Sequence, residues 1–598
     1  MLENSCETDI LVVGAGPAGA SLACFLASHG LRGIMISASH GTADTPRAHI
    51  TNMAALECLR DIGLDQEIRS MATKGHCMQH TRWCYSMAGE ELARIPSWGN
   101  DPRRKGDYEL ASPCDPVDIP QTLLEPVLTR YASHHGFVVR FNTKLVSWRH
   151  DPSDGKYLVN VWDDVSKIHF SIRTKYIFGA DGARSLTIKT LQIPLIAKSG
   201  GGLAINVLVK ADLSHLMEHR SGNLHWLMQP DVDHPEFGWM GIARMVKPWF
   251  EWIFILFPSP GFDASVPISN EAYKGRIQTL IGDDTNVDIL SVSRWYVNDI
   301  VAERYSEGNI FCLGDAVHRH PPMNGLGSNT CIQDAFNLAW KVAYVEKGLA
   351  GRSLLDTYST ERQPVGVSIV SQANDSFRKH SAVWKSLGMM EQTVEERSDI
   401  FKLLFSPTRE GRKARESFRQ AITATSHEFH GLGIEMNQLY SSSCIYVKDE
   451  PLPYCPSERA AEDNVAYYDP STYPGRRLPH AWLNRAIPSK MVSTIDLAGH
   501  GAFTVLTGPG GMLWKEAAKA VAAARGCEIK VWSVGFRQDW EDVYFDWGRL
   551  RGFEESGAVL VRPDRFVAWR AREVPNDLDS CVEKLSEVMR VILGPGDT

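Results

Sequence analysis

The stretch DILVVGAGPAG, residues 9–19, decides the fold of the N-terminal part of the chain. Its first five residues are a β-branched apolar run, long enough for a buried parallel strand. A glycine-rich turn follows directly, and apolar residues at helical spacing then continue to Gly30, where a left-handed cap can end a helix. A strand, a tight glycine turn and a helix in this order predict a dinucleotide site, because backbone N–H groups and the positive helix end can approach a pyrophosphate there.

The polar residues after this unit depart from the usual pattern at one position. The ribose-binding acid normally stands about 20 residues farther on, and this chain has Ser37 there. A serine hydroxyl supplies one hydrogen bond instead of the charged, two-oxygen grip of a carboxylate. Farther along, Arg47 offers a guanidinium that can neutralise a pyrophosphate. We expect both residues at the dinucleotide site, with only a single hydroxyl for the ribose.

Two more buried strands are expected to end at acidic residues. One lies in YIFGADGARS, residues 176–185, and the other in NIFCLGDA, residues 309–316. Ligands of doubly wound folds gather at the carboxyl ends of the strands, where a carboxylate can hold sugar hydroxyls. A helix should follow, with Ser328 or Asn329 as its N-cap and Gly348 at its end. Its start beside a glycine loop can stabilise negative charge on a bound ring system.

The composition excludes several classes of protein and partner. The chain has 598 residues, of which 43% are hydrophobic and 22% charged, and a formal net charge of −8. These values predict about three or four domains and rule out a collagenous, disordered or disulfide-stapled chain. The mildly acidic balance gives no reason to expect nucleic acid as a partner. No stretch offers the ~20 uninterrupted apolar residues of a membrane span, so no integral membrane segment is expected.

The cysteines and histidines indicate a reduced protein without a metal. The 12 cysteines are scattered and form no CxxC pair, which is typical of reduced thiols in the cytoplasm. His318-Arg319-His320 places two potential ligands close together but lacks a third of suitable spacing. We therefore expect a cytoplasmic protein and no metal site.

Three motifs in order carry a resemblance to a known family. The glycine turn at residues 14–19, then Gly179-Ala180-Asp181-Gly182, then Gly314-Asp315 resemble those of the class A FAD-dependent aromatic hydroxylases, which share the p-hydroxybenzoate hydroxylase fold. Longer segments are similar to the phenol and 2,4-dichlorophenol 6-monooxygenase type of that family, and the similarity spans nearly the whole chain. These segments are TPRAHITN (45–52), YELASPCDPVDIPQTLLEP (108–126), GDAVHRHPPMNGLGSNTCIQDAFNLAWK (314–341), PGRRLPHAWL (474–483) and GAVLVRPDRFVAWR (557–570).

The resemblance implies an α/β fold with a Rossmann-like FAD-binding domain, an interleaved β-rich substrate domain and a C-terminal thioredoxin-like domain. The FAD-binding domain must be discontinuous, because strand-rich sequence separates its motifs. The expected parts are the first part of the FAD-binding domain at 1–200, which contains insertions of the substrate domain, the β-rich substrate domain at 201–300, the last part of the FAD-binding domain at 301–375, a helical region at 376–450, and a linker with the thioredoxin-like domain at 451–598.

The resemblance also implies a non-covalent FAD, with NADPH or NADH as co-substrate, and assigns residues to the cofactor. Arg47 and Gln121 would contact its phosphate and ribityl regions, and Asp315 would bind a ribityl hydroxyl. Asp181 would link the FAD site to the path of the nicotinamide. Lys189 stands where the family often has an arginine. Its ammonium group supplies a single positive charge and cannot form the two parallel hydrogen bonds of a guanidinium. The other implied cofactor residues are Gly14, Gly16, Pro17, Ala18, Gly19 and Ser37 around the adenosine and pyrophosphate, and Pro322, Gly325, Leu326, Gly327 and Asn329 along the isoalloxazine.

Candidates for the chemistry come from two parts of the chain. Activation of a phenol requires a base or a hydrogen-bond acceptor near its hydroxyl. His49 is the first candidate, because it stands near the position at which phenol hydroxylases place an acid; the alternative is a histidine that only bridges the loop. Arg244, in the expected substrate sheet, is the second catalytic candidate. Trp226, Met240 and Trp252 stand in the same region and are the candidates that shape the substrate pocket.

These features together predict an FAD-dependent monooxygenase. It would use NAD(P)H and O2 to hydroxylate a phenolic or polycyclic aromatic substrate through a flavin hydroperoxide, ortho to an existing hydroxyl. One alternative is Baeyer–Villiger oxygenation of an aromatic ketone or quinone. Another is a flavin-binding protein without turnover. The resemblance also implies a homodimer.

Overall fold

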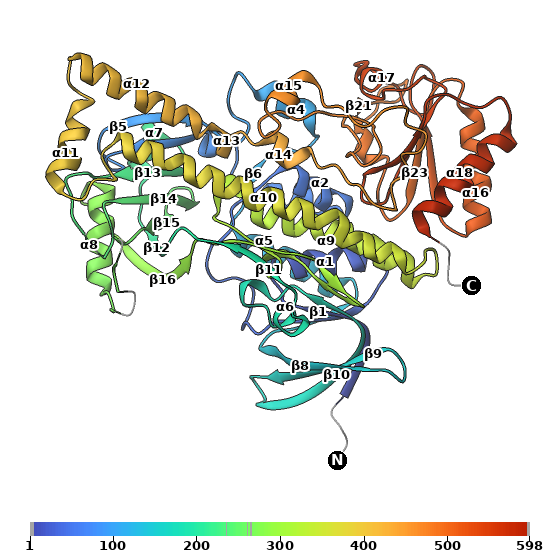
Figure 1. The fold of residues 1–598 in the computed structure, drawn as a ribbon, viewed down its shortest axis with the longest axis horizontal. Coiled ribbons are helices and arrows are strands. Elements are labelled where there is room, and N and C mark those ends of the chain that lie inside the picture. Colours follow the sequence, from blue (N-terminus) through green and yellow to red (C-terminus); the bar gives the residue numbers. More distant parts are fainter. Residues whose placement is uncertain (1–4, 235, 260, 264–265, 595–598) are drawn as a thin grey trace.

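A mainly parallel sheet at the centre of the molecule carries the N-terminal glycine turn. The computed structural model describes residues 5–234, 236–259, 261–263 and 266–594 (Figure 1). The strands of this sheet are β1 (Ser5–Val13), β2 (Gly33–Ile36), β7 (Phe137–Arg140), β8 (Thr143–Asp151), β9 (Lys156–Asp163), β10 (Ile168–Gly179), β18 (Ser306–Glu307) and β19 (Ile310–Cys312). Their order is β18-β19-β10-β1-β2-β7, with β8 and β9 attached beside β10. We call this sheet with its covering helices the first domain.

The parallel strands of the first domain end side by side at one edge. β1 pairs with β10 and β2 so that Val13 lies opposite both Gly179 and Ile36, and β10 pairs with β19. Backbone hydrogen bonds join the turns that leave these strands, from Gly14 N to Ile36 O at 2.7 Å and from Ala180 N to Val13 O at 2.8 Å. The three motif-bearing segments, far apart in the sequence, therefore meet at this edge.

Helices cover one face of the sheet. α1 (Pro17–Ser28) lies between α5 (Gln121–His134) and α9 (Leu326–Glu346) and contacts both. Along β1, Ile10 and Val12 face this helical side, whereas Leu11 and Val13 belong to the core beneath β8 and β9. Because the side chains of a strand alternate between its faces, an apolar run buries both sides of the sheet.

The start of α9 differs from the expectation. The helix begins at Leu326 with Gly325 as its N-cap at φ +62°, so Ser328 and Asn329 lie inside it. The side chain of Asn329 is used elsewhere: its Nδ2 donates to Ile50 O at 2.8 Å, and its Oδ1 accepts from Asn52 N at 2.9 Å. A tertiary contact thus takes the polar group that the sequence pattern assigns to a cap, and the prediction of Ser328 or Asn329 as N-cap was wrong.

The second large sheet of the molecule has seven strands and is mostly antiparallel. Its strands are β4 (His80–Cys84), β5 (Glu91–Pro96), β12 (Leu203–Lys210), β13 (Leu224–Met228), β14 (Met240–Lys247), β15 (Glu251–Leu256) and β16 (Asp288–Tyr296). They follow the order β16-β12-β15-β14-β13-β4-β5, so the insertion at β4–β5 completes one edge. Apolar residues of α8 (Asn270–Ile281) pack on one face of this sheet.

The long helix α10 (Ser353–Ser386) connects the two sheets. In Figure 1 it runs from the first domain to the seven-stranded sheet. Its N-terminal half contributes Tyr358 to the core of the first domain, and its C-terminal half contributes Val383 to the core on the other face of the seven-stranded sheet. The helices that follow are α11 (Val394–Leu403), α12 (Arg409–Ala424), α13 (Ser426–Phe429) and α14 (Leu432–Met436). The expected helical region at 376–450 thus begins inside α10.

The C-terminal domain has its own four-stranded sheet, at the red end of Figure 1. β23 (Phe503–Thr507) pairs in parallel with β24 (Ile529–Ser533) and antiparallel with β25 (Ala558–Val561), which pairs with β26 (Val567–Ala571). α16 (Met512–Arg525) and α18 (Leu578–Leu593) pack together against this sheet. The βαβ unit followed by two antiparallel strands and a helix supports the thioredoxin-like description, which stays a prediction.

The other elements are short connections between these layers. None of the helices in the described part of the chain combines the length and the apolar character that a bilayer crossing needs. The remaining elements are α2 (Met53–Asp61), α3 (Asp65–Met71), α4 (Lys105–Ala111), α6 (Leu186–Leu191), α7 (Ser214–Arg220), α15 (Glu458–Glu462), α17 (Asp546–Leu550), β3 (Ile50–Thr51), β6 (Val117–Asp118), β11 (Leu195–Lys198), β17 (Asp299–Ala302), β20 (His318–Arg319), β21 (Trp482–Leu483) and β22 (Val492–Ser493).

Candidate functional site

The segment that joins β1 to α1 leaves no room for a side chain at Gly14 or at Gly19. Gly14 has φ +110°, and a Cβ on it would lie 2.1 Å from Ala180 O. A Cβ on Gly19 would lie 1.9 Å from Gly14 O, so the start of α1 approaches the turn closely. Gly16 is the N-cap of α1 and supplies no side-chain oxygen to the helix. The first turn of α1 contains no acidic residue. The exposed donors and positive end of α1 therefore fit a diphosphate, which is what the glycine spacing predicts.

Two polar residues of α5 face this turn. Gln121 Nε2 donates to Glu125 Oε1 at 2.5 Å, and Glu125 Oε2 accepts from Ala43 N at 2.5 Å. Burial raises the pKa of Glu125, while Gln121 and the charge of the exposed Arg47 act to lower it. Gln121 and Arg47, both expected at the cofactor, thus lie close to the same carboxyl group. Ser37 directly follows β2 and is 9% exposed.

The acids at the other two strand ends differ in their surroundings. Asp181 accepts from Ser185 Oγ at 2.6 Å and from Thr187 N at 2.9 Å, so its carboxylate caps the start of α6. Asp315 follows β19 and its side chain is exposed at the edge where the three motifs meet. Asp181 is therefore engaged within its own loop, whereas Asp315 is presented outward, as a ribityl contact requires.

The loop before α9 is tied down on two sides. A Cβ on Gly325 would lie 3.1 Å from Ile50 Cβ. The side chain of Asn329 forms hydrogen bonds with the backbone of Ile50 and Asn52. On the other side Asn324, at φ +61°, donates from Nδ2 to His427 O of α13 at 2.6 Å. The first turn of α9 has neither a capping side chain nor an acid. Pro322, Gly325, Leu326 and Gly327 thus form a fixed loop at a positive helix end.

A buried polar group lies beside this loop. β3 pairs antiparallel with β6, which brings His49 next to Asp118, with 3.4 Å between His49 Nδ1 and Asp118 Oδ1. Asp118 Oδ2 accepts from Arg244 Nη2 and from Asn223 Nδ2, both at 2.7 Å. All four side chains are less than a tenth exposed. We call His49, Asp118, Asn223 and Arg244 the Asp118 cluster, and it unites both catalytic candidates of the sequence on one carboxylate.

The electrostatics of the Asp118 cluster leave a neutral imidazole and an ionised carboxylate. Burial lowers the pKa of His49, and the neighbouring Arg244 lowers it further. Burial acts to raise the pKa of Asp118, but the charge of Arg244 and the contact with His49 bring it below its usual value. His49 Nδ1 and Asp118 Oδ1 lie 3.4 Å apart, and neither of these atoms nor His49 Nε2 has a well-formed hydrogen bond among the described residues. Such buried, unsatisfied groups call for a partner, which a substrate hydroxyl can supply.

The candidates for the substrate pocket divide between the two faces of the seven-stranded sheet. Trp226 and Met240 pack into the same core as Ile50, on the face that also carries Arg244. The ring of Trp226 stacks on His380 of α10 with centroids 4.2 Å apart. Trp252 is fully buried in the opposite core, beneath α8. The structure therefore places Trp226 and Met240 on the face of the sheet that carries Arg244, and Trp252 on the opposite face.

Several residues of this region had no assignment from the sequence. Asp118 stands within the similar segment 108–126, and a single acid between Val117 and Ile119 was the available signal. Asn223 precedes β13 without any motif. His380 and Glu428 form a buried pair with 2.5 Å between Nε2 and Oε2, and only the pairing of α10 with α13 reveals it.

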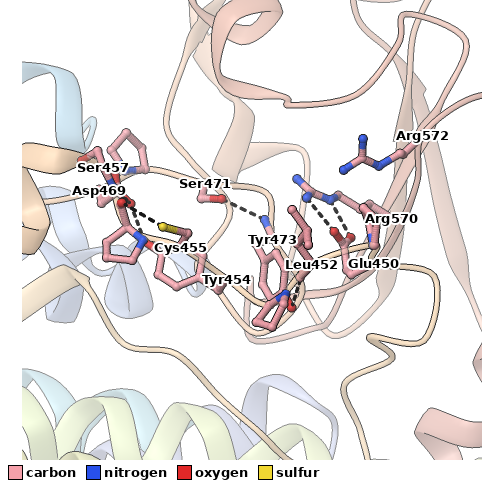
Figure 2. A pocket seen from close by; sticks show the side chains of 14 residues that line it. Glu450, Leu452, Tyr454, Cys455, Ser457, Asp469, Ser471, Tyr473, Arg570 and Arg572 are labelled. Carbon is pink, nitrogen blue, oxygen red and sulfur yellow. Dashed lines mark hydrogen bonds and ion pairs between the residues drawn. The ribbon is translucent and has the colours of Figure 1, made fainter.

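A hollow outside this region lies between the linker and the C-terminal domain. Figure 2 shows this pocket of about 430 Å³, lined by residues within 450–473 and by Arg570 and Arg572. Arg570 donates from Nε and Nη2 to the two carboxylate oxygens of Glu450 at 2.7 and 2.8 Å. No glycine of the three motifs and no member of the Asp118 cluster lines it, so it is separate from the candidate site.

Comparisons with known proteins identify the family. Residues 7–373 match the family model of the FAD binding domain, and residues 471–596 match that of the C-terminal region of aromatic-ring hydroxylases. The 2,4-dichlorophenol 6-monooxygenase of Cupriavidus pinatubonensis is 41% identical over 98% of this chain and 96% of its own. The phenol 2-monooxygenase of a Pseudomonas species is 39% identical over 97% of this chain and 92% of its own.

Solved structures agree with this result. The flavin-dependent monooxygenase PieE, determined with FAD and substrate, superposes with a TM-score of 0.91 at 38% identity and covers 98% of this chain and 99% of its own. A ternary complex of aklavinone-11 hydroxylase gives a TM-score of 0.78 at 27% identity, over 98% and 99% of the two chains. The expected α/β fold class with an FAD-binding domain is confirmed. The chain belongs to the family of FAD-dependent aromatic-ring hydroxylases and is a monooxygenase.

Proposed function

We propose that this enzyme hydroxylates a phenolic or polycyclic aromatic compound ortho to an existing hydroxyl, with NAD(P)H as reductant and O2 as oxidant. The observation that carries the proposal is the Asp118 cluster, in which a neutral His49 and a carboxylate oxygen lie buried without a well-formed hydrogen bond, beside the fixed loop before α9. The relatives named for phenol and dichlorophenol hydroxylation support the substrate class.

The residues of the cluster have distinct parts in this proposal. A bound FAD supplies the redox and oxygen chemistry. The substrate hydroxyl donates its proton to His49, and Asp118 stabilises the imidazolium that forms, because its negative charge lies 3.4 Å away. Arg244 and Asn223 hold Asp118 in position by hydrogen bonds. A phenolate is a more electron-rich ring than the phenol, so this proton transfer prepares the ring for hydroxylation.

The cofactor contacts follow the geometry of the strand ends. The glycine turn with Pro17 and Ala18 would hold the pyrophosphate, Asp315 a ribityl hydroxyl, and the loop from Pro322 to Asn329 the isoalloxazine edge. The open helix ends of α1 and α9 and the outward position of Asp315 support these roles. Ser37, Arg47 and Gln121 lie along the same edge and would contact the adenosine, phosphate and ribityl parts. Asp181 would act on the path of the nicotinamide.

The test is turnover with product identification. The purified protein should be yellow, and a phenol that fits should accelerate NAD(P)H and O2 consumption and gain one hydroxyl next to its own. A product with oxygen inserted into the carbon skeleton would instead show Baeyer–Villiger chemistry. Absence of stimulated consumption across a broad panel of phenols, together with normal flavin content, would contradict the proposal.

Two further properties belong to this proposal. We infer a cytoplasmic enzyme, because all twelve cysteines are free thiols in the structure. We also infer a homodimer, on the resemblance of the chain to its family. Light scattering of the purified protein tests the second point, and a monomer mass across concentrations would contradict it.

A further inference from the structure

An arginine of the C-terminal domain is buried against the first domain. Arg562, directly after β25, donates from Nη1 and Nη2 to the two carboxylate oxygens of Glu361 at 2.6 and 3.0 Å. Its Nε also donates to Asp564 Oδ1 at 2.9 Å. Arg562 and Glu361 are both fully buried. Glu361 belongs to α10, so this bidentate pair connects two separate domains.

The surroundings of Glu361 form a closed and balanced network. Glu361 Oε2 also accepts from Lys341 Nζ and Asn337 Nδ2 of α9, both at 2.7 Å. Glu361 and Asp564 contribute two negative charges, and Arg562 and Lys341 contribute two positive ones. Burial opposes ionisation, but the charges of Arg562 and Lys341 hold the pKa of Glu361 well below its usual value. We call these five residues the Glu361 network; removing one charge from it leaves another buried and unpaired.

The next residue of α10 reaches the cofactor motif. Arg362 Nε donates to Asp334 Oδ1 at 2.7 Å. The other oxygen of Asp334 lies 2.9 Å from His318 Nε2 and accepts from Gly314 N at 3.5 Å. Gly314 itself is closely packed, because a Cβ on it would lie 2.8 Å from Ala18 Cβ at the start of α1. Asp334 therefore lies directly behind the Gly314-Asp315 motif.

We propose that Arg562 is a positioning residue for FAD, through which the C-terminal domain fixes the Gly314-Asp315 motif of the first domain. Glu361 and Arg362 are neighbours on α10, so the grip of Arg562 on one sets the position of the other. This inference rests on the proposed role of Asp315 as a ribityl contact. It gives the C-terminal domain, which has no dithiol motif, a part in retaining the cofactor.

The experiment compares FAD binding by full-length variants. Apoprotein is titrated with FAD by flavin fluorescence, and the visible spectrum of the bound flavin is recorded. Arg562→Met should weaken FAD binding about tenfold or more and shift the spectrum, since Glu361 loses the bidentate partner that fixes its position. The double variant Arg562→Met/Glu361→Gln restores the charge balance but not the bidentate grip, so it should recover the melting temperature while FAD binding stays about tenfold weaker.

A matched control separates positioning from stability. Arg570 is another arginine of the C-terminal domain with a bidentate carboxylate partner, Glu450, at the pocket of Figure 2. Arg570→Met should lower the melting temperature but leave FAD affinity within about twofold. If Arg562→Met yields too little folded protein, Arg562→Lys keeps the charge, loses the fork and should weaken FAD binding about threefold.

The outcomes distinguish this inference from the proposed function. An unchanged protein that takes up no FAD would refute the proposed function itself. If the unchanged protein binds FAD and Arg562→Met binds it equally well with the same spectrum, only the positioning role is refuted. Full recovery of FAD binding in the double variant, which lacks the grip of Arg562, would likewise contradict positioning by this residue.

Discussion

The Asp118 cluster and the Glu361 network are both buried groups of charges, but only one of them is closed. Every carboxylate oxygen of Glu361 accepts at least two hydrogen bonds, and the charges of its network cancel. In the Asp118 cluster one carboxylate oxygen and both nitrogens of His49 have no well-formed hydrogen bond among the described residues, and His49 Nδ1 lies 3.4 Å from that oxygen. A folded chain tolerates such open groups mainly where function needs them. The difference teaches that the closed group is complete as a framework, whereas the open group can still bind a substrate hydroxyl.

The largest expected effect concerns the carboxylate of the open cluster. Asp118→Asn removes the charge that stabilises a protonated His49, so kcat for a phenolic substrate should fall by about 10²- to 10⁴-fold while FAD is still bound. Steady-state oxygen uptake measures it. Asp115→Asn, at a largely exposed acid nearby, is the control and should stay within about twofold. If Asp118→Asn were as active as the unchanged enzyme, the Asp118 cluster would have no catalytic part that distinguishes it from the Glu361 network.

The matching change in the closed network should affect stability instead of turnover. Lys341→Met leaves a negative charge buried without balance and should lower the free energy of unfolding by about 3–5 kcal/mol. With FAD at saturation, kcat should stay within about threefold of the unchanged enzyme. Denaturant unfolding monitored by tryptophan fluorescence measures the first quantity. Lys347→Met, at an exposed position at the end of α9, should change neither.

The pH dependence of turnover sharpens the comparison at His49. Because burial and Arg244 lower the pKa of His49, the imidazole is neutral at pH 7 and can accept a proton. Activity should therefore be full at neutral pH and fall only as the pH drops through this lowered pKa. His49→Phe should reduce kcat about 10- to 100-fold and abolish this acidic limb, yet leave the melting temperature unchanged or higher, because two unsatisfied nitrogens disappear. An acidic limb that persists in His49→Phe would assign it to another group.

The smallest expected effect comes from the amides that serve the two groups. Asn223→Ala removes one hydrogen bond to Asp118 and should lower kcat about three- to tenfold, with little loss of stability. Asn337→Ala removes a hydrogen bond to Glu361 and should instead cost about 1–3 kcal/mol of stability with kcat retained at saturating FAD. Kinetics and thermal unfolding of the two variants, measured side by side, show whether Asn223 affects mainly kcat and Asn337 mainly stability.

The local part of the site could be predicted from the sequence, and the long-range part could not. The strand ending at Val13 and the helix after the glycine motif were predicted, because apolar runs and glycines act within a few residues, although α1 begins at Pro17, inside the motif. Asp118 has no such local signal. Its importance arises only when β3 pairs with β6 and when Arg244 arrives from another sheet.

The faces of a strand explain the remaining difference. Trp226 and Trp252 look alike in the sequence, since each stands in an apolar run of the seven-stranded sheet. Which face each ring takes depends on strand register and on where α8 and α10 lie, and neither is encoded within the strand itself. The N-cap of α9 was predicted wrongly for a similar reason. The side chain of Asn329 donates to the backbone of Ile50, which is far away in the sequence.

The discontinuity of the first domain has a consequence for how the enzyme is made. β1 leaves the ribosome first, but its neighbour β10, then β19, and finally the loop with Arg562 emerge much later. Until β10 emerges, a nascent chain can pair β1 on one side only, with β2, and leaves the other edge of this apolar strand exposed. With the role proposed for Arg562, flavin capture is a late event in biogenesis, and we expect a chain cut short before its last hundred residues to hold its prosthetic group only weakly.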